Sequence, residues 1–485
     1  MQHNYPKLRL QAISGIKWNL LGQVLVYLIV LIGTAILSRL ISPSEYGIFG
    51  MIAVLTNLAN MVVGMGVSLA IIQDNTLDNK DVSSIFWLNI IIGSVVGLIF
   101  FIGAPLIAQF YHQPKLIFIS RLFSLVFLLH AAKSVPTGLL SKESDFKSLS
   151  YGQIISNILS FSVAVVLALN GFGVISLVIQ AIVLNLLITI FNFYYVKWFP
   201  SFMLRKDSLQ KIKSFSLNYL PSQIIDFFSS NLDIVLIGKY LGPRNVGLYG
   251  KAMALVLIPI NLVSQVFNKS FYPIFSKVQN NSEGIKKIYL KSSKIMALVL
   301  FPLYALMIIQ AKQVILILFG SQWLESAYLV KVLGVYAIFY SLNSFNETFL
   351  LSQGKANWLL KINIVDKIIL VILFVVALKF GLIYFAYAKL VVIVIAFIVK
   401  FLISGIVHRV TIWFWMKSIY KIILALILLI ASGLLIKTFF LNYHPFVLIS
   451  VVTSLSLFVF AFTLYLLRDE SYFEISNMIK GYLRK

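Results

Sequence analysis

Charged and amide side chains occur inside long apolar blocks of this sequence. Lys133, for example, is flanked by Leu128, Leu129 and Val135 and is followed by Pro136, which can break a helix. Because an ionisable group is costly to place in hydrocarbon, each one is a candidate for a polar pathway. A lysine there could contact phosphate, and a carboxylate could change its Na⁺ or proton occupancy between two conformations. The candidates are Gln23, Arg39, Asn57, Asn60, Arg121, Lys133, Gln223, Asp226, Asn231, Asp233, Lys239, Lys251, Asn261 and Glu347.

Each candidate also has a structural interpretation. Arg39, Lys239 and Lys251 lie near predicted helix ends, where long side chains extend to lipid headgroups. Asp226 and Asp233 are seven positions apart and share one helix face, and Asp233 could pair with a Lys or Arg in the bundle. The amides could be hydrogen bonds between helices. Asp366 and Lys367 are predicted to lie at the membrane interface, and Lys133 is the strongest candidate for phosphate contact.

Motifs for catalysis, metal binding or nucleotide binding do not occur in the sequence. The five histidines have no HxxxH or HExxH spacing, and there is no GxSxG and no GxxxxGK[ST] sequence. Cysteine is absent, so disulfides and thiolate chemistry are excluded. We therefore expect no catalytic residue, no metal site and no cofactor, and no ATP-driven engine within the chain.

The composition is that of a membrane protein. Of 485 residues, 60% are hydrophobic and only 12% are charged. Apolar blocks such as Trp18 to Leu37 and Ile85 to Ile107 are near the ~20 residues that cross a bilayer as a helix. The formal charge of +24 lies mainly in short loops, so retention at a cytoplasmic face explains it better than nucleic-acid binding. The sequence predicts an all-α integral membrane protein.

About fourteen transmembrane helices are predicted. Their ranges are 12–37, 46–72, 84–108, 116–140, 151–169, 172–195, 214–240, 246–272, 292–319, 326–352, 358–378, 381–407, 418–436 and 446–467. Lys and Arg are more frequent in the loops on the N-terminal side, whereas Lys133, Lys269 and Lys400 lie too deep to assign to either side. This asymmetry predicts a multi-pass protein of the plasma (inner) membrane with both termini in the cytoplasm.

A repeat relates the two halves of the chain. A shift of 200 residues aligns LSRLISPSEYGIFG at 37–50 with IGKYLGPRNVGLYG at 237–250, so that Pro and both Gly coincide. The Pro is expected to end a helix, the first Gly to allow a tight turn and the second to allow close helix packing. A weaker match pairs residues 139–141 with 350–352. The alternative is that any helix hairpin attracts Pro and Gly to its turn.

Duplication predicts two parallel six-helix lobes, the arrangement of an alternating-access transporter. The expected domains are an N-terminal lobe at 1–196, a cytoplasmic linker at 197–213, a C-terminal lobe at 214–407, two additional helices within 408–467 and a cytoplasmic tail at 468–485.

The junction sequence, together with NLDIVLIG at 231–238 and GLY at 247–249, resembles the polysaccharide-exporter branch of the multidrug/oligosaccharidyl-lipid/polysaccharide superfamily. That branch includes Wzx-type O-antigen and capsule flippases and teichuronic acid exporters. The resemblance covers about residues 10–410. It implies two six-helix lobes in a V shape and transfer of an undecaprenyl-diphosphate-linked oligosaccharide to the outer leaflet of the bacterial plasma membrane.

Such a flippase must offer a wet, cationic cavity to its glycan diphosphate while the lipid tail stays in the bilayer. The expected partners are the lipid-linked oligosaccharide, membrane lipid and the polysaccharide polymerase or chain-length machinery, with no nucleic acid. Two alternatives remain: a cation-coupled multidrug exporter with the same fold, and a membrane-embedded polysaccharide polymerase or ligase. The second needs a large outer loop, and no connection between blocks exceeds about 20 residues.

Overall fold

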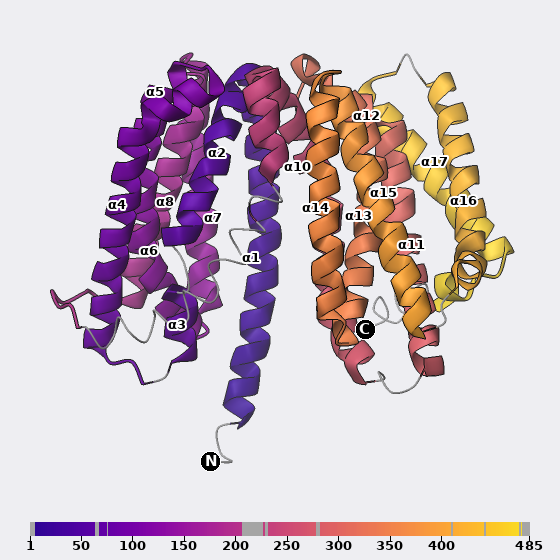
Figure 1. The fold of residues 1–485 in the computed structure, drawn as a ribbon, viewed down its shortest axis with the longest axis horizontal. Coiled ribbons are helices and arrows are strands. Elements are labelled where there is room, and N and C mark those ends of the chain that lie inside the picture. Colours follow the sequence, from indigo (N-terminus) through magenta and orange to yellow (C-terminus); the bar gives the residue numbers. More distant parts are fainter. Residues whose placement is uncertain are drawn as a thin grey trace. The chain divides into compact units, whose positions relative to one another are not determined.

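The computed structural model describes residues 5–63, 67–74, 76–205, 227, 231–277, 282–408, 411–440, 443–474 and 477. Within these ranges the chain is helical and has no β-strand. It divides into two compact units, Met1–Gly247 and Leu248–Lys485, coloured from indigo to magenta and from magenta to yellow in Figure 1. The predicted boundaries of the lobes, linker and tail stay a prediction.

Unit 1 is a bundle of antiparallel helices. Its elements are α1 (Tyr5–Leu40), α2 (Pro43–Val63), α3 (Val67–Gln73), α4 (Asn79–Tyr111), α5 (Lys115–Phe123), α6 (Leu125–Lys142), α7 (Phe146–Leu169) and α8 (Val174–Val196), followed by a helical stretch at 231–241. Helix α7 packs against α1 and α8, and α6 packs against both α4 and α8 (Figure 1). The α6–α8 contact is therefore in the middle of the unit.

Local sequence signals set the limits of α4. Asp78 forms a capping box with Asp81, which satisfies two backbone N–H groups that the first helical turn leaves without partners. At the other end His112 adopts a left-handed conformation, φ 56°, and its N–H bonds back to the carbonyl groups of Ala108 and Gln109. The 33 residues between these caps are long enough to cross a bilayer.

Unit 2 contains the remaining elements. They are α10 (Pro243–Lys277), which begins in unit 1, α11 (Ser282–Ile309), α12 (Ala311–Leu318), a short 3₁₀ helix (Ser321–Trp323), α13 (Ser326–Ser352), α14 (Ala356–Leu378), α15 (Leu382–His408), α16 (Ile412–Phe439) and α17 (Pro445–Leu466). Helix α15 packs against α13 and α14, while α16 and α17 pack on each other, α16 against α11 and α17 against α12. The helices added after the repeat are thus joined to unit 2.

The predicted class, an all-α integral membrane protein, is confirmed. The predicted count of fourteen transmembrane helices is not confirmed. Ten helices of the described chain are long and apolar enough to span a membrane. Two predicted helices are broken. The helix expected at 116–140 is α5 and α6, divided at Ser124, and the one expected at 292–319 is α11 and α12, divided at Gln310.

The repeated junction is built differently from its prediction. Pro43 and Pro243 begin α2 and α10 instead of ending a helix, so Gly47 and Gly247 lie in the first turns of these helices and form no tight turn. A Cβ added at Gly47 would overlap the carbonyl oxygen of Pro243, and one added at Gly247 would overlap that of Pro43. The two copies of the junction pack backbone to backbone, and this close approach requires glycine at both positions.

Candidate functional site

A lysine of unit 1 lies at the contact between α6 and α8. The ammonium of Lys133 donates a hydrogen bond to Oδ1 of Asn185 at 2.6 Å. The amide nitrogen of Asn185 donates to the carbonyl of Ala181 at 2.8 Å, and this second bond keeps the amide oxygen directed at the lysine. Among the described residues no carboxylate pairs with Lys133. Its partner is a neutral dipole, so its positive charge is not cancelled.

More polar groups continue along the same two helices. Asn192 donates to Oγ1 of Thr137 at 2.8 Å, and Thr189 donates to the carbonyl of Leu129 at 3.3 Å. Asn185, Thr189 and Asn192 are spaced four and three positions apart, which places them on one face of α8. The α6–α8 contact is therefore lined by a strip of polar side chains.

Seven buried side-chain polar atoms of unit 1 have no hydrogen-bond partner within the described part of the chain, and three of them are amide or imidazole atoms on α2, α4 and α6. These three are Nδ1 of His130, one turn before Lys133, Oδ1 of Asn89 on α4 and Oδ1 of Asn60 on α2. Asn89 also donates to the carbonyl of Ala131 on α6 at 2.9 Å, so it lies against the helix that carries Lys133. Because buried polar groups are normally paired, this region is suited to a polar ligand.

Unit 2 contains a lysine cluster with different partners, centred on the buried Lys400. The ammonium of Lys400 on α15 is 2.5 Å from Oε1 of Glu347 on α13 and 3.8 Å from Oδ2 of Asp366 on α14. The side chain of Lys400 is 1% exposed and that of Glu347 is 35% exposed. Two carboxylates thus compensate one ammonium, and the three charges join three helices.

Neighbouring contacts extend this cluster. The hydroxyl of Tyr289 donates to Oδ1 of Asn346 at 2.7 Å, next to Glu347 in sequence. Three turns before Lys400 on α15, Lys389 donates to the hydroxyl of Tyr249 at 2.9 Å and lies over the ring of Tyr336. Lys389 and Lys400, eleven positions apart, share one face of α15.

Most of the predicted site residues that the structure describes do not join either lysine cluster. Lys251 is buried against the rings of Phe319 and Trp323, at 5.0 and 5.4 Å from their centroids. Lys239 lies over the ring of Phe110. The exposed predicted residues are Gln23, Arg39, Asn57, Arg121 and Asn261.

The predicted carboxylates and amides near 230 are only partly described. Asp233 is buried, and its Oδ1 accepts the backbone N–H of Ile234 at 2.9 Å. Asn231 donates to the carbonyl of Phe227 at 2.9 Å, a bond along its own helix. Gln223 and Asp226 lie outside the described residues, as does the side chain of Lys269.

Sequence reasoning missed three members of the clusters. Lys400 was identified only as too deep to assign to a side of the membrane, and that depth was a usable signal because an ammonium there is costly and either has polar partners or serves a function. Asp366 was predicted to lie at the interface, and its contact with Lys400 in the cluster of three charges was not foreseen. Asn185 gave no signal, since a lone amide in an apolar block does not reveal its partner.

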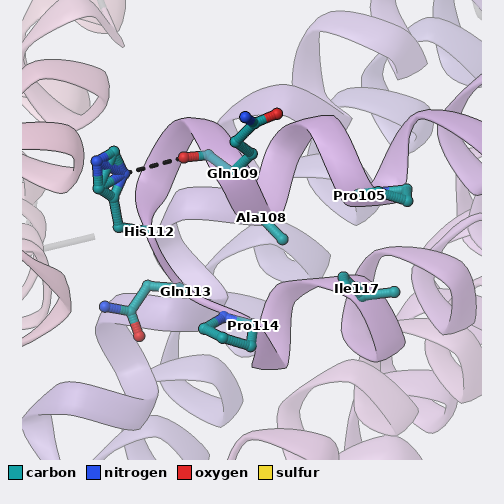
Figure 2. Close-up of a pocket in the computed structure, with 7 residues that line it drawn as sticks. All are labelled: Pro105, Ala108, Gln109, His112, Gln113, Pro114 and Ile117. Carbon is teal, nitrogen blue, oxygen red and sulfur yellow. Dashed lines mark hydrogen bonds between the residues drawn. The ribbon is translucent and has the colours of Figure 1, made fainter.

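A pocket of about 550 Å³ lies at the turn between α4 and α5. Its lining residues are Pro105, Ala108, Gln109, His112, Gln113, Pro114 and Ile117. Figure 2 shows the amide groups of Gln109 and Gln113 on opposite sides, while the His112 ring is bonded to the carbonyl of Gln109 at 2.9 Å. With no charged side chain and no convergent polar groups, this pocket is poorly suited to a diphosphate.

Comparison with known proteins decides the family. A family model described as polysaccharide biosynthesis protein matches residues 36–328, more than half of the chain. The chain belongs to this family. Its relatives and structural neighbours confirm the resemblance to polysaccharide exporters of the multidrug/oligosaccharidyl-lipid/polysaccharide superfamily. Proteins of the polysaccharide biosynthesis family and their structural neighbours are transporters and flippases and not enzymes.

Two relatives of this chain are named for the biosynthesis of polysaccharides. The teichuronic acid biosynthesis protein TuaB of Bacillus subtilis (strain 168) is 27% identical over 354 residues, which are 73% of each chain. The succinoglycan biosynthesis transport protein ExoT of Rhizobium meliloti (strain 1021) is 27% identical over 67% of this chain and 65% of its own length. One of the two relatives is therefore a protein named for transport.

A solved structure has a similar fold. The lipid II flippase MurJ in an inward closed conformation superimposes with a TM-score of 0.73, over 94% of this chain and 99% of that chain, at 15% identity. At this identity the likeness concerns the fold. The match extends well beyond residues 36–328 of the family model, so the transporter fold includes most of unit 2.

Proposed function

We propose that this protein transfers an undecaprenyl-diphosphate-linked oligosaccharide from the cytoplasmic to the outer leaflet of the bacterial plasma membrane, by alternating access. Membership of a polysaccharide biosynthesis family and the transporter fold support this proposal. They leave open which chemical group of the substrate the protein contacts. The orientation with both termini in the cytoplasm is part of the proposal and follows from the distribution of Lys and Arg.

The observation that carries the proposal is the environment of Lys133. A diphosphate needs a cation in a medium of low polarity, where a charged hydrogen bond is strong. Lys133 lies among helices, is bonded to an amide, and has no carboxylate among its described neighbours. Lys400, by contrast, already has two carboxylates, so it is less able to attract a phosphate. We therefore assign the phosphate contact to Lys133, with Asn185 holding the ammonium in place.

The first experiment is genetic. In a deletion strain without a redundant exporter, lipid-linked repeat units should accumulate on the cytoplasmic leaflet and surface polysaccharide should be lost. Normal surface polysaccharide in that strain would refute the proposal. Increased drug sensitivity with intact polysaccharide would instead favour the multidrug exporter.

The second experiment isolates Lys133. Loss of one charged hydrogen bond, about 1.5–3 kcal/mol, predicts that Lys133→Met lowers transport of a lipid-linked diphosphate in proteoliposomes by roughly tenfold or more. Lys133→Arg should retain part of it. Lys147→Met, which removes an exposed lysine lying over the rings of Trp18 and Tyr151, is the matched control. Equal transport by the two methionine variants would remove Lys133 from the substrate site.

Coupling to a Na⁺ or proton gradient is also part of the proposal. Glu347 is a suitable carboxylate, because it is partly exposed and its ammonium partner could be exchanged for a cation. We expect Glu347→Gln to make transport insensitive to collapse of the coupling gradient. If transport by Glu347→Gln stays gradient-dependent, Asp226 or Asp233 must carry the coupling or none of the three does. Association with polymerase and chain-length proteins stays a prediction.

A further inference from the structure

The residues directly after α8 combine two properties that rarely occur together. Residues 197–205 contain no helix, and their backbone leaves the bundle at Lys197, which has a left-handed φ of 52°. The same nine residues expose large apolar side chains: Phe199 is 78% exposed, Phe202 is 88% exposed, and Leu204 is also exposed. We name residues 197–205 the strap.

Contacts with α4 hold the strap in one position. The hydroxyl oxygens of Ser83 and Ser84 accept the backbone N–H groups of Ser201 and Arg205, both at 3.1 Å. Trp87 donates through Nε1 to the carbonyl of Ser201 at 3.0 Å, and its ring stacks on Phe202 with centroids 4.3 Å apart. The strap is therefore fixed beside the first two turns of α4.

Neither water nor hydrocarbon suits this segment. In hydrocarbon, the backbone N–H and C=O groups of a non-helical, lipid-exposed segment would lose their partners at a cost of several kcal/mol each. In water, two exposed phenylalanines and a leucine within six residues would form an apolar patch. The headgroup layer of a bilayer satisfies both demands, since it hydrates the backbone and accepts aromatic rings.

The position of the strap in the fold agrees with this placement. It follows a candidate membrane span, Val174–Val196, without a gap, and it contacts the first turns of another, Asn79–Tyr111. Both span ends should lie near the bilayer surface. Arg205 pairs with Asp78 at 3.2 Å and lies 3.9 Å from Asp81, so its charge is compensated within the protein.

We infer that the strap is a membrane-binding surface that inserts Phe199 and Phe202 into the headgroup layer and thereby fixes the depth of α4 and α8 in the bilayer. Its partner is the lipid interface itself. Arg205 is compensated, and the exposed Lys197 is the other cation of the strap. Because the strap also has two largely exposed phenylalanines, we expect aromatic partitioning, and not attraction to anionic lipid, to drive the insertion.

The absence of cysteine makes the test direct, because every introduced cysteine is unique. Nitroxide labels at Phe202→Cys and Phe199→Cys, in the full-length protein in liposomes of zwitterionic lipid, are compared for contact with dissolved oxygen and with a water-soluble nickel chelate. Glu143→Cys, in the turn after α6, gives the aqueous reference, and Ile99→Cys, on the exposed middle of α4, gives the hydrocarbon reference.

Both strap labels should fall between the two references and keep their depth when anionic lipid or salt is added. A depth equal to that of position 143 or of position 99 would overturn the inference, and a depth that requires anionic lipid would replace it with electrostatic binding. Ser83→Ala combined with Ser84→Ala should increase the mobility of the label at position 202, whereas Ser94→Ala on the same helix should not.

Discussion

Each unit of this protein holds a lysine between helices in a hydrogen-bonded or ion-paired cluster, Lys133 partly buried and Lys400 buried, yet the two lysines have opposite surroundings. Lys133 in unit 1 bonds to the neutral amide of Asn185, whereas Lys400 in unit 2 lies against the carboxylates of Glu347 and Asp366. A buried ammonium that faces carboxylates has its charge cancelled and ties helices together. An ammonium that faces only a neutral dipole keeps its positive charge uncompensated, and an anionic ligand can bind to that charge. This difference is the basis of our proposal that Lys133 contacts the substrate, and it predicts a structural role for Lys400.

The largest effect is expected from breaking the cluster of unit 2. Lys400→Met leaves two carboxylates without their cation, and removal of one partner of a buried ion pair costs about 3 kcal/mol or more. The melting temperature in detergent should fall strongly. Glu347→Gln and Asp366→Asn added to Lys400→Met should restore most of it, while Lys361→Met on the exposed side of α14 should change little. A melting temperature unaffected by Lys400→Met would mean that the two lysines do not differ in the way proposed.

A smaller loss is expected at the repeated junction, where the two units again differ. Gly47 and Gly247 belong to unit 1 and each lies against the backbone of the other copy, whereas an added Cβ at Gly250 in unit 2 would meet no atom within 4 Å. Overpacking costs about 1–3 kcal/mol, so Gly47→Ala and Gly247→Ala should each lower the melting temperature. Gly250→Ala should leave it unchanged or raise it slightly, because alanine favours the helix. Equal behaviour of the three variants would contradict the close approach.

The sequence predicted the helical membrane class and the repeat because both depend on features that repeat along the chain: apolar length and a Pro–Gly pattern. It did not predict how helices break. Helices are interrupted at Ser124 and Gln310, and neither residue carries a local signal as strong as proline. The role of Gly47 was wrong for the same reason, since its partner is 196 positions away in sequence, at Pro243.

The candidate site was predicted only where depth alone was informative. Lys133 and Glu347 were identified as charges inside apolar blocks, but their partners Asn185 and Lys400 lie 52 and 53 positions further along. In both cases the two residues lie on parallel helices that are separated in sequence by one helix running the opposite way. These are α6 and α8 for the first pair and α13 and α15 for the second. A search for polar pairs at this spacing would have found both contacts.

A further variant makes unit 1 resemble unit 2. Asn185→Asp would give Lys133 a carboxylate at the position of its present amide oxygen, 2.6 Å away. Stability should change by no more than about 1 kcal/mol, since a well-placed ion pair roughly offsets its desolvation. Transport of the lipid-linked diphosphate should nevertheless fall, because the substrate phosphate now competes with a resident carboxylate. Asn170→Asp, at the exposed end of α7, is the control. Transport by Asn185→Asp at the level of the unmodified protein would show that the neutrality of residue 185 is unimportant.

The smallest effect is expected from the exposed ion pair between Arg205 and Asp78, in contrast to the charges around the buried Lys400. A hydrogen bond from the backbone N–H of Asp81 lowers the pKa of Asp78 below the ordinary value of an aspartate, and the Arg205 charge 3.2 Å away lowers it further. When folding lowers the pKa of a carboxyl group, that group stabilises the folded state at pH values above its pKa in the unfolded chain. This stabilisation is lost as the pH falls through the pKa of the group in the folded protein. The mobility of a nitroxide at position 202 should therefore be constant between about pH 8 and pH 5 and increase only below about pH 4. Asp78→Asn should remove that acidic transition, and a transition near neutral pH in the unmodified strap would show that another group controls its attachment to α4.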